Sequence, residues 1–301
     1  MERYNRLNDY LKNKFGERTL KICIDGGFTC PNRDGSKGIG GCTFCSEKGS
    51  GEHLHSFETI SMQVQDYFKS YKSCRANKFI AYFQNFTNTY DSLKNLKNKY
   101  DSALIDDRIV ALAVATRPDC INETVVKLLK SYSEKYYVWV ELGLQTANEK
   151  TAQLINRCYS NDDFSKAVQL LNEYDIDVVT HVMVGLPGES FDDIKETVAF
   201  LNKHNIQGLK IHSCYVVNGS SLALQYLNGS YIPISLDEYI DSACYILTHI
   251  SPNIVIHRIS GDAPKDLLLA PEWNGHKKWI MNGINKKLND ENLYQGMYYS
   301  K

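Results

Sequence analysis

Short apolar runs alternate with amphipathic segments along most of the chain. The apolar runs are rich in β-branched and aromatic residues, and several are apolar on both faces, as the strands of a buried parallel sheet are. The pattern predicts six strands, at Leu20–Ile24, Lys78–Phe83, Ile109–Ala115, Tyr136–Leu142, Ile176–Val184 and Leu209–Val217.

Helical patterns fill the gaps between these strands. Residues 58–72 and 122–133 are amphipathic, and after Asn161 and Asp162 apolar residues recur at helical spacing. Ser190, with Asp193 three residues later, forms a capping-box pattern in which Asp replaces the usual Glu or Gln. An apolar stripe follows the cap, at Phe191, Ile194, Val198 and Leu201.

Repeated alternation of strands and helices predicts βαβ units and therefore a parallel sheet covered by helices. Six units fall short of the eight in a closed barrel. We therefore expect an α/β fold with a partial (β/α)6 TIM-type barrel and an active site at the carboxyl ends of its strands. Residues 1–250 are expected to form this core, with an N-terminal helical lead-in. Residues 251–301, with a last strand and a terminal amphipathic helix, are expected to pack on it as a C-terminal helical extension.

Composition and charge add a few limits. The 301 residues are 43% hydrophobic and 23% charged, as in an ordinary soluble protein. No apolar run approaches the roughly 18 residues of a membrane span, and the polar amino terminus lacks a secretory stretch, so we expect a cytoplasmic protein without a membrane partner. The net charge of −1 does not indicate a nucleic-acid partner, although basic side chains cluster in residues 3–18, 69–78 and 277–287.

Three of the nine cysteines, Cys30, Cys42 and Cys45, form a tight group directly after the first predicted strand. The last two are a Cys-x-x-Cys pair, which can bind one metal ion or two corners of a cluster, and the Gly-rich loop before them lets the backbone bring Cys30 back. Three thiolates leave one iron of a 4Fe–4S cluster open for a cofactor or substrate. The spacing alone also admits a zinc site or structural cysteines. The other cysteines lack ligand spacing and are expected to be buried thiols: Cys23, Cys74, Cys120, Cys158, Cys214 and Cys244.

Several motifs carry a resemblance to a known family. The cysteine loop is CPNRDGSKGIGGCTFC, with Phe44 directly before its last cysteine. Around it stand, in order, RYNRLNDYLKNKFGERTLKI, AYFQNFTNTY, ATRPDCI, VELGLQTANEKTAQLINR, HVMVGLPGES, KIH, GDAPKDLLLAPEW and YQGMYY. With these motifs the chain resembles the radical S-adenosylmethionine (SAM) superfamily. Within it, the resemblance is to the YtqA/YhcC-type (MnmL-like) branch and, more distantly, to the elongator catalytic subunit. The gap between the first two cysteines is longer than is usual in the superfamily.

The resemblance implies a radical SAM barrel in which Cys30, Cys42 and Cys45 bind a 4Fe–4S cluster. The open iron holds the amino and carboxylate groups of SAM, and the reduced cluster cleaves SAM to a 5′-deoxyadenosyl radical that abstracts hydrogen from the substrate. Cofactor contacts are implied near the strand ends, from Phe44, Gln84, Glu141, Gln145, Arg157, His181 and Gly185. Gln84 stands where most of the superfamily has a glycine-rich turn, so only its location carries over.

The resemblance also implies a role for most of these residues. Glu141 and His181 are expected to meet ribose hydroxyls, and Gln145 the ribose or the carboxylate. Arg157 is expected to pair with the SAM carboxylate through its guanidinium fork. Gly185, at the start of a Gly-Leu-Pro-Gly turn, is expected near the adenine, although the turn also suits an ordinary strand-to-helix connection.

No residue pattern names the substrate. Arg33, Arg117 and His212 are candidates for contacting it, although the arginines also suit local ion pairs and the histidine a core position. The resemblance implies a tRNA wobble uridine, trimmed from 5-carboxymethylaminomethyl-uridine to 5-aminomethyl-uridine. Implied partners are tRNA, a reductant such as flavodoxin or ferredoxin, and a tRNA methyltransferase acting afterwards. The alternatives are a radical SAM enzyme acting on a small metabolite or a protein, and a non-enzymatic zinc-structural RNA-binding protein.

Overall fold

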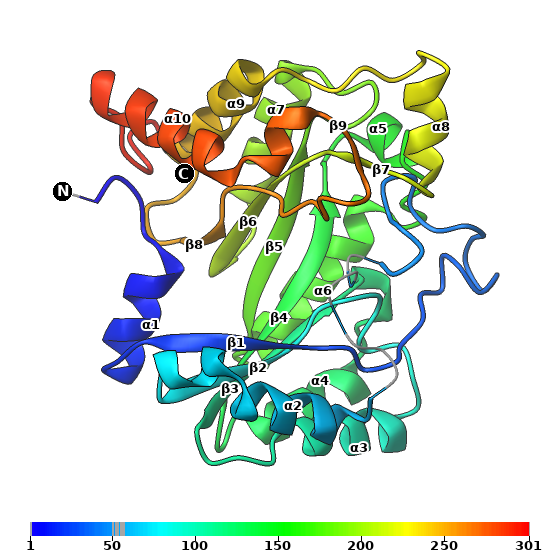
Figure 1. Cartoon of the computed structure of the whole chain (residues 1–301), viewed down its shortest axis with the longest axis vertical. Coiled ribbons are helices and arrows are strands. Elements are labelled where there is room, and N and C mark those ends of the chain that lie inside the picture. Colours follow the sequence, from blue (N-terminus) through cyan, green and yellow to red (C-terminus); the bar gives the residue numbers. More distant parts are fainter. Residues whose placement is uncertain (1, 50, 52–53, 55–57, 301) are drawn as a thin grey trace.

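A single curled sheet of seven parallel strands organises the chain (Figure 1). The computed structural model describes residues 2–49, 51, 54 and 58–300. The strands follow one another across the sheet in chain order, as successive βαβ units do. They are β1 (Thr19–Ile24), β2 (Lys78–Phe83), β3 (Ile109–Thr116), β4 (Tyr137–Gln145), β5 (Asp177–Val184), β6 (Gly208–Ser213) and β8 (Val255–Arg258). The sheet is the expected α/β partial barrel, with β1 and β8 at its two edges.

The structure confirms the six predicted strands and the last strand expected after residue 251, which is β8 and joins the same sheet. β8 lies in the segment expected to form the C-terminal extension, and it pairs in parallel with β6. The strand predicted at Leu209–Val217 is wrong in its second half, because β6 ends at Ser213 and the chain leaves the sheet there. Val216–Val217 instead form β7, which pairs antiparallel with β9 (Leu268–Ala270). The apolar run continues through this turn, so periodicity alone does not reveal it.

Helices lie outside the curled sheet (Figure 1). They are α1 (Leu7–Phe15), α2 (Ile60–Lys69), α3 (Leu93–Ala103), α4 (Glu123–Tyr132), α5 (Glu149–Leu154), α6 (Asn161–Glu173), α7 (Phe191–Leu201), α8 (Ser221–Leu227), α9 (Leu236–His249) and α10 (Lys277–Asp290). Short 3-10 turns lie at Tyr71–Arg75, Pro118–Cys120 and Glu272–Gly275. α10 packs on α9, and α9 contacts α7 and β5. None of the helices in the described ranges is long and apolar enough to cross a membrane.

Capping boxes with a serine at the cap begin three of these helices. Ser160, Ser190 and Ser235 each accept a hydrogen bond from the backbone N–H three residues on, and the acidic side chain at that position bonds back to the cap. The capping box predicted at Ser190 is therefore confirmed. In the apolar stripe predicted after it, Phe191 is wrong, because it is 42% exposed while the other three members are buried. Its ring lies edge-on against Tyr245 at the surface.

The inside of the curled sheet is filled in layers along the strands, as in barrels of this type. Near the amino ends, α1 contacts both edge strands, β1 and β8. Leu11 of α1 joins an apolar cluster with Ile80, Trp139 and Val179. Further along the strands, polar and charged side chains replace the apolar ones and surround a cavity. The apolar layer and α1 thus close the amino end of the half-barrel and leave the carboxyl end for a ligand site.

Candidate active site

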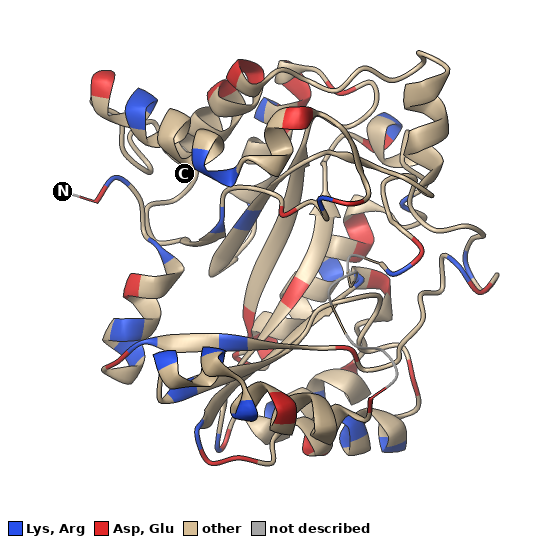
Figure 2. Cartoon of the chain, viewed as in Figure 1, with Lys and Arg blue, Asp and Glu red and all other residues tan. Residues whose placement is uncertain are grey.

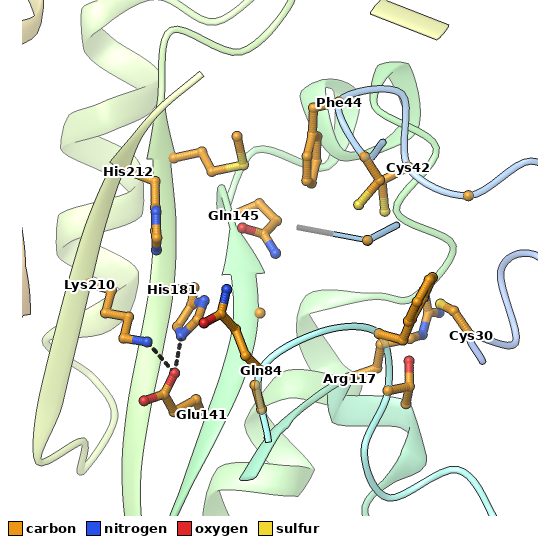
Figure 3. A pocket seen from close by; sticks show the side chains of 18 of the residues that line it. Cys30, Cys42, Phe44, Gln84, Arg117, Glu141, Gln145, His181, Lys210 and His212 are labelled. Atoms are coloured by element: carbon orange, nitrogen blue, oxygen red, sulfur yellow. Dashed lines mark hydrogen bonds and ion pairs between the residues drawn. The ribbon is translucent and has the colours of Figure 1, made fainter. Parts of the chain in front are cut away.

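A cavity of about 640 Å³ lies at the carboxyl ends of the strands, where the fold was expected to place its active site (Figure 3). This volume is typical of cofactor and substrate sites. The cysteine loop after β1 contributes part of the wall, and residues of the other strands and of the loops that follow them contribute the rest. All but two of the predicted site residues line it: Cys30, Arg33, Cys42, Phe44, Cys45, Gln84, Arg117, Glu141, Gln145, His181 and His212.

The cysteine loop is fastened to the barrel by Asn32, which was not among the predicted site residues. Asn32 is fully buried, and its side-chain amide donates to the Asn156 carbonyl oxygen at 2.6 Å. The same amide lies 3.6 Å from the Cys42 sulfur. The Thr43 N–H donates to the Ile155 carbonyl oxygen at 3.0 Å, which ties the loop to the end of α5. A buried asparagine with these partners holds the loop in one position over the cavity.

The chemistry of the loop fits an iron–sulfur cluster. A hydrogen bond between the two thiols raises the pKa of Cys42 well above its ordinary value and lowers the pKa of Cys45; burial raises both, and the nearby Arg33 charge lowers that of Cys45 further. Among the described residues, no group of three or more His, Cys, Asp or Glu side chains is arranged to hold one metal ion. Three thiols lining one cavity do fit a 4Fe–4S cluster with one open iron.

Gln145 projects from an irregular end of β4. The register of β4 against β5 shifts between Gly143 and Gln145, and Gln145 has a φ of 67°, a left-handed conformation that few non-glycine residues adopt. The absence of a side chain at Gly143 leaves room for the Gln145 side chain, because a Cβ at position 143 would lie 2.6 Å from the Gln145 amide nitrogen. Figure 3 shows the Gln84 and Gln145 amides between the cysteine loop on one side and β6 on the other. Amides in this position suit the polar groups of a cofactor.

Glu141 is enclosed within the wall of the cavity, and its side chain has no exposure. The Tyr82 hydroxyl donates to its carboxylate at 2.7 Å and His181 Nε2 at 2.8 Å. Figure 3 shows the carboxylate between His181 and Lys210. Five donors from different strands surround it: Lys21 on β1, Tyr82 on β2, Trp139 on β4, His181 on β5 and Lys210 on β6.

These contacts set the charge states at the base of the cavity. Burial raises the pKa of Glu141, but Lys210, Lys21 and His181 outweigh it and hold that pKa well below its ordinary value. Burial lowers the pKa of His181 to about 4, so the ring is neutral near pH 7 and its Nε2 donates to the carboxylate. Burial also lowers the pKa of Lys210 to about 7, with the help of Lys21 and against the attraction of Glu141. One carboxylate thus compensates two lysines only in part.

The expected ribose contact of Glu141 has no support in this geometry, because its carboxylate faces these five donors. Lys21, Tyr82 and Lys210 were not among the predicted site residues. A signal was present, since Lys21 and Lys210 are charged residues inside the otherwise apolar strand sequences LKICI and LKIHS. Only the assembled sheet shows that the two lysines share one carboxylate.

Arg157 lies outside the cavity and is fully buried. Its guanidinium donates to the carbonyl oxygens of Leu144, Thr146 and Tyr159, at 2.9, 2.8 and 3.0 Å. These bonds hold the backbone of the connection between β4 and α6. The geometry therefore gives Arg157 a structural position and offers no support for its expected contact with the SAM carboxylate.

The remaining candidates lie in different settings. Gly185 borders a separate cavity, and its N–H donates to the Glu189 carboxylate at 2.9 Å, which closes the turn. Arg117 lines the main cavity but also forms the local ion pair that its sequence allowed, with two bonds of 2.9 Å to Asp119. Arg33 donates to backbone carbonyl oxygens of its own loop.

We expect Arg157→Ala to unfold more readily than the wild type. The substitution leaves three buried carbonyl oxygens without this donor, at a cost of about 1–3 kcal/mol each. Thermal unfolding measures the loss of stability, and equilibrium dialysis with SAM should give an unchanged affinity per folded, cluster-loaded molecule. A lower SAM affinity without a loss of stability would instead support the carboxylate contact.

Comparisons with known proteins agree with this geometry. Residues 30–201 match the Radical SAM superfamily, and residues 206–290 match the Radical SAM C-terminal domain. The chain is 39% identical to the uncharacterized protein YtqA of Bacillus subtilis (strain 168), over 100% of this chain and 94% of YtqA. It is 34% identical to protein YhcC of Escherichia coli (strain K12), over 96% of this chain and 93% of YhcC.

More distant proteins share part of the chain or its fold. The tRNA uridine(34) acetyltransferase of Methanocaldococcus infernus is 30% identical over 166 residues, which are 54% of this chain and 30% of that protein. A solved structure of the archaeal Methanocaldococcus infernus Elp3 has the same fold, with a TM-score of 0.70 at 18% identity, over 92% of this chain and 64% of that chain. The superfamily match spans more than half of the chain and begins at the first cysteine of the loop. The chain belongs to the radical SAM superfamily of enzymes.

Proposed function

We propose that Cys30, Cys42 and Cys45 bind a 4Fe–4S cluster and that the cavity beside them holds SAM. The observation that carries the proposal is the convergence of these three thiols on one cavity at the carboxyl ends of the strands. When bound and reduced, the cluster supplies the electron that cleaves SAM to methionine and the 5′-deoxyadenosyl radical. Phe44 and Gln145 line the space next to the thiols, where their side chains would orient the cofactor.

We infer that the substrate is the wobble uridine of a tRNA. Support comes from relatives named for tRNA uridine 34, which align with about half of this chain. Further support comes from local clusters of basic residues, since Figure 2 marks Lys and Arg positions along the ribbon of α1 and α10. With a net charge of −1, RNA binding would depend on such clusters and on stacking of unpaired bases rather than on overall attraction.

The proposed reaction converts 5-carboxymethylaminomethyl-uridine to 5-aminomethyl-uridine. The glycine-derived methylene loses a hydrogen atom to the radical and then one electron, which leaves an imine that water hydrolyses to the amine and glyoxylate. SAM takes up these two electrons overall and ends as methionine and 5′-deoxyadenosine, so no further oxidant is needed. A donor such as flavodoxin or ferredoxin would supply the priming electron, and a methyltransferase would act on the amine afterwards.

The test uses anaerobically reconstituted protein, dithionite, SAM and tRNA that carries 5-carboxymethylaminomethyl-uridine. We expect equal molar amounts of 5′-deoxyadenosine and 5-aminomethyl-uridine, measured by chromatography and by mass spectrometry of digested tRNA. Cleavage of SAM that leaves the tRNA unchanged would contradict the tRNA step and favour a small metabolite or a protein as substrate. Intact SAM together with bound zinc would contradict the radical mechanism.

A further inference from the structure

The cavity has a basic end, made by Lys210, His212 and Arg258, which all line it. Lys210 and His212 are two residues apart on β6 and therefore point to the same face of the sheet. Arg258, on β8, is the cross-strand partner of Lys210. Figure 3 shows Lys210 and His212 on the side of the cavity away from Cys30 and Cys42. The basic end therefore lies opposite the proposed cluster.

Deep in the basic end, one carboxylate serves two ammonium groups. Glu141 forms an ion pair with Lys210 and lies 3.5 Å from Lys21. The Lys210 side chain is only 5% exposed, so solvent screens the excess positive charge weakly. Burial lowers the pKa of Lys210 to about 7, the attraction of Glu141 opposes this shift, and Lys21 adds to it.

Near the rim, acidic and basic side chains occur together. Arg258 pairs with Asp262 at 3.0 Å, and Asp262 also pairs with Lys277 at 2.9 Å. A further acid that lines the cavity, Asp266, is exposed. Arg258 forms its ion pair with Asp262 through a guanidinium, a group that carries five N–H donors. Two cations therefore face the Asp262 carboxylate, as two face the carboxylate deeper in the cavity.

His212 adds an unsatisfied polar atom. Its Nε2 is buried and has no hydrogen-bond partner in the part of the chain that the structure describes. The ring centroid lies 5.2 Å from that of His181. Burial, then His181 and Arg258, lower the pKa of His212 well below its ordinary value, so the ring is neutral. A buried nitrogen of this kind normally meets a bound water or ligand.

We propose that the basic end binds the carboxylate group of the substrate. Arg258 presents a guanidinium fork that suits a carboxylate, His212 Nε2–H donates to it, and Lys210 supplies charge. The inference rests on the proposed function, in which the glycine-derived substituent of the uridine carries this carboxylate. The carboxylate of SAM belongs to the open iron, so the two carboxylates would be held at opposite ends of the cavity.

Such binding would direct the chemistry to one methylene. A carboxylate held at the basic end places the adjacent CH2 group on the side that faces the proposed SAM position. The product 5-aminomethyl-uridine lacks the carboxylate, so it loses the contacts with Arg258 and His212. Substrate is therefore expected to bind more tightly than product.

The test compares the nucleosides 5-carboxymethylaminomethyl-uridine and 5-aminomethyl-uridine, titrated calorimetrically into cluster-loaded, SAM-bound protein without a reductant. The readout is binding, because no turnover takes place. We expect the wild type to prefer the carboxylate-bearing nucleoside by about ten- to a hundredfold. Arg258→Gln should lose most of this preference and Arg258→Lys should keep part of it. Lys127→Gln, at an exposed site on α4, should keep all of it.

Each result bears on the carboxylate site separately from the radical mechanism. The wild-type protein can bind both nucleosides equally, or neither of them, and still cleave SAM. Either result would overturn the carboxylate site and leave the radical mechanism intact. A preference that survives in folded, cluster-loaded Arg258→Gln would overturn it as well. The wild type could also prefer the carboxylate-bearing nucleoside, with Arg258→Gln losing that preference, while the wild type leaves tRNA unmodified. This result would support the carboxylate site and contradict the tRNA step. Circular dichroism and iron content check folding and loading.

Discussion

Cys42→Ala is expected to leave the protein without an iron–sulfur cluster. Cys42 is one of three proposed ligands, and the buried Asn32 amide lies 3.6 Å from its sulfur. Two remaining thiolates hold such a cluster poorly, so iron and acid-labile sulfide should fall from about four each per chain to a small fraction of that. The visible absorption of the cluster should disappear with them, and metal analysis with absorption spectroscopy measures both.

Cys74→Ala is the matched control for this prediction. The prediction of a buried thiol at Cys74 is wrong, because the residue is exposed on the short turn after α2; it also lies outside the cavity lining. This variant should bind as much iron and sulfide as the wild type. Full cluster content in Cys42→Ala would mean that another group takes the ligand position, and the assignment of Cys42 would then be wrong.

Glu141→Gln is expected to destabilise the fold by about 3–5 kcal/mol, the range for breaking a buried ion pair. The substitution keeps the size of the side chain but removes the charge that compensates Lys210 and Lys21. It also replaces a carboxylate, which accepts from five donors, by an amide whose NH2 group is itself a donor. Urea unfolding followed by circular dichroism measures the free energy of unfolding of both proteins at pH 7.

The effect of Glu141 should depend on pH in one direction. Its pKa in the folded state lies well below the ordinary value of 4.5, so its stabilising contribution is present at pH 7 and is lost as the pH falls from 4.5 toward the folded value. The difference in the free energy of unfolding between the two proteins should therefore shrink in acid.

Asp241→Asn, which removes an exposed ion pair with Lys287, is the control and should cost less than about 1 kcal/mol. Equal stability of Glu141→Gln and this control at pH 7 would contradict the account of the buried charges.

The sheet and the position of the three cysteines at the cavity could be predicted because their signals are local. Runs such as residues 109–115 are apolar on both faces, and a serine cap such as Ser190 fixes the start of a helix by itself. Three thiols in one glycine-rich loop also depend little on distant segments. β7, in contrast, forms because Leu268–Ala270 pairs with it, and no local pattern contains that partner.

Roles that depend on several strands could not be predicted in this way. The donors around Glu141 come from β1, β2, β4, β5 and β6, so its enclosure exists only once the sheet is assembled. Arg157 was expected to contact the cofactor, yet its guanidinium is turned to backbone carbonyl oxygens. Residue type and position near the strand ends therefore predicted the place of the site better than the role of each side chain.

Formation of 5′-deoxyadenosine by the wild-type protein tests the central claim most directly. Anaerobically reconstituted protein is incubated with dithionite and SAM, and the nucleoside is quantified by chromatography. We expect 5′-deoxyadenosine to accumulate with time and in proportion to the cluster content of the sample. If SAM stays intact in protein that is folded and loaded with iron and sulfide, the cavity does not support radical SAM chemistry and the account is wrong.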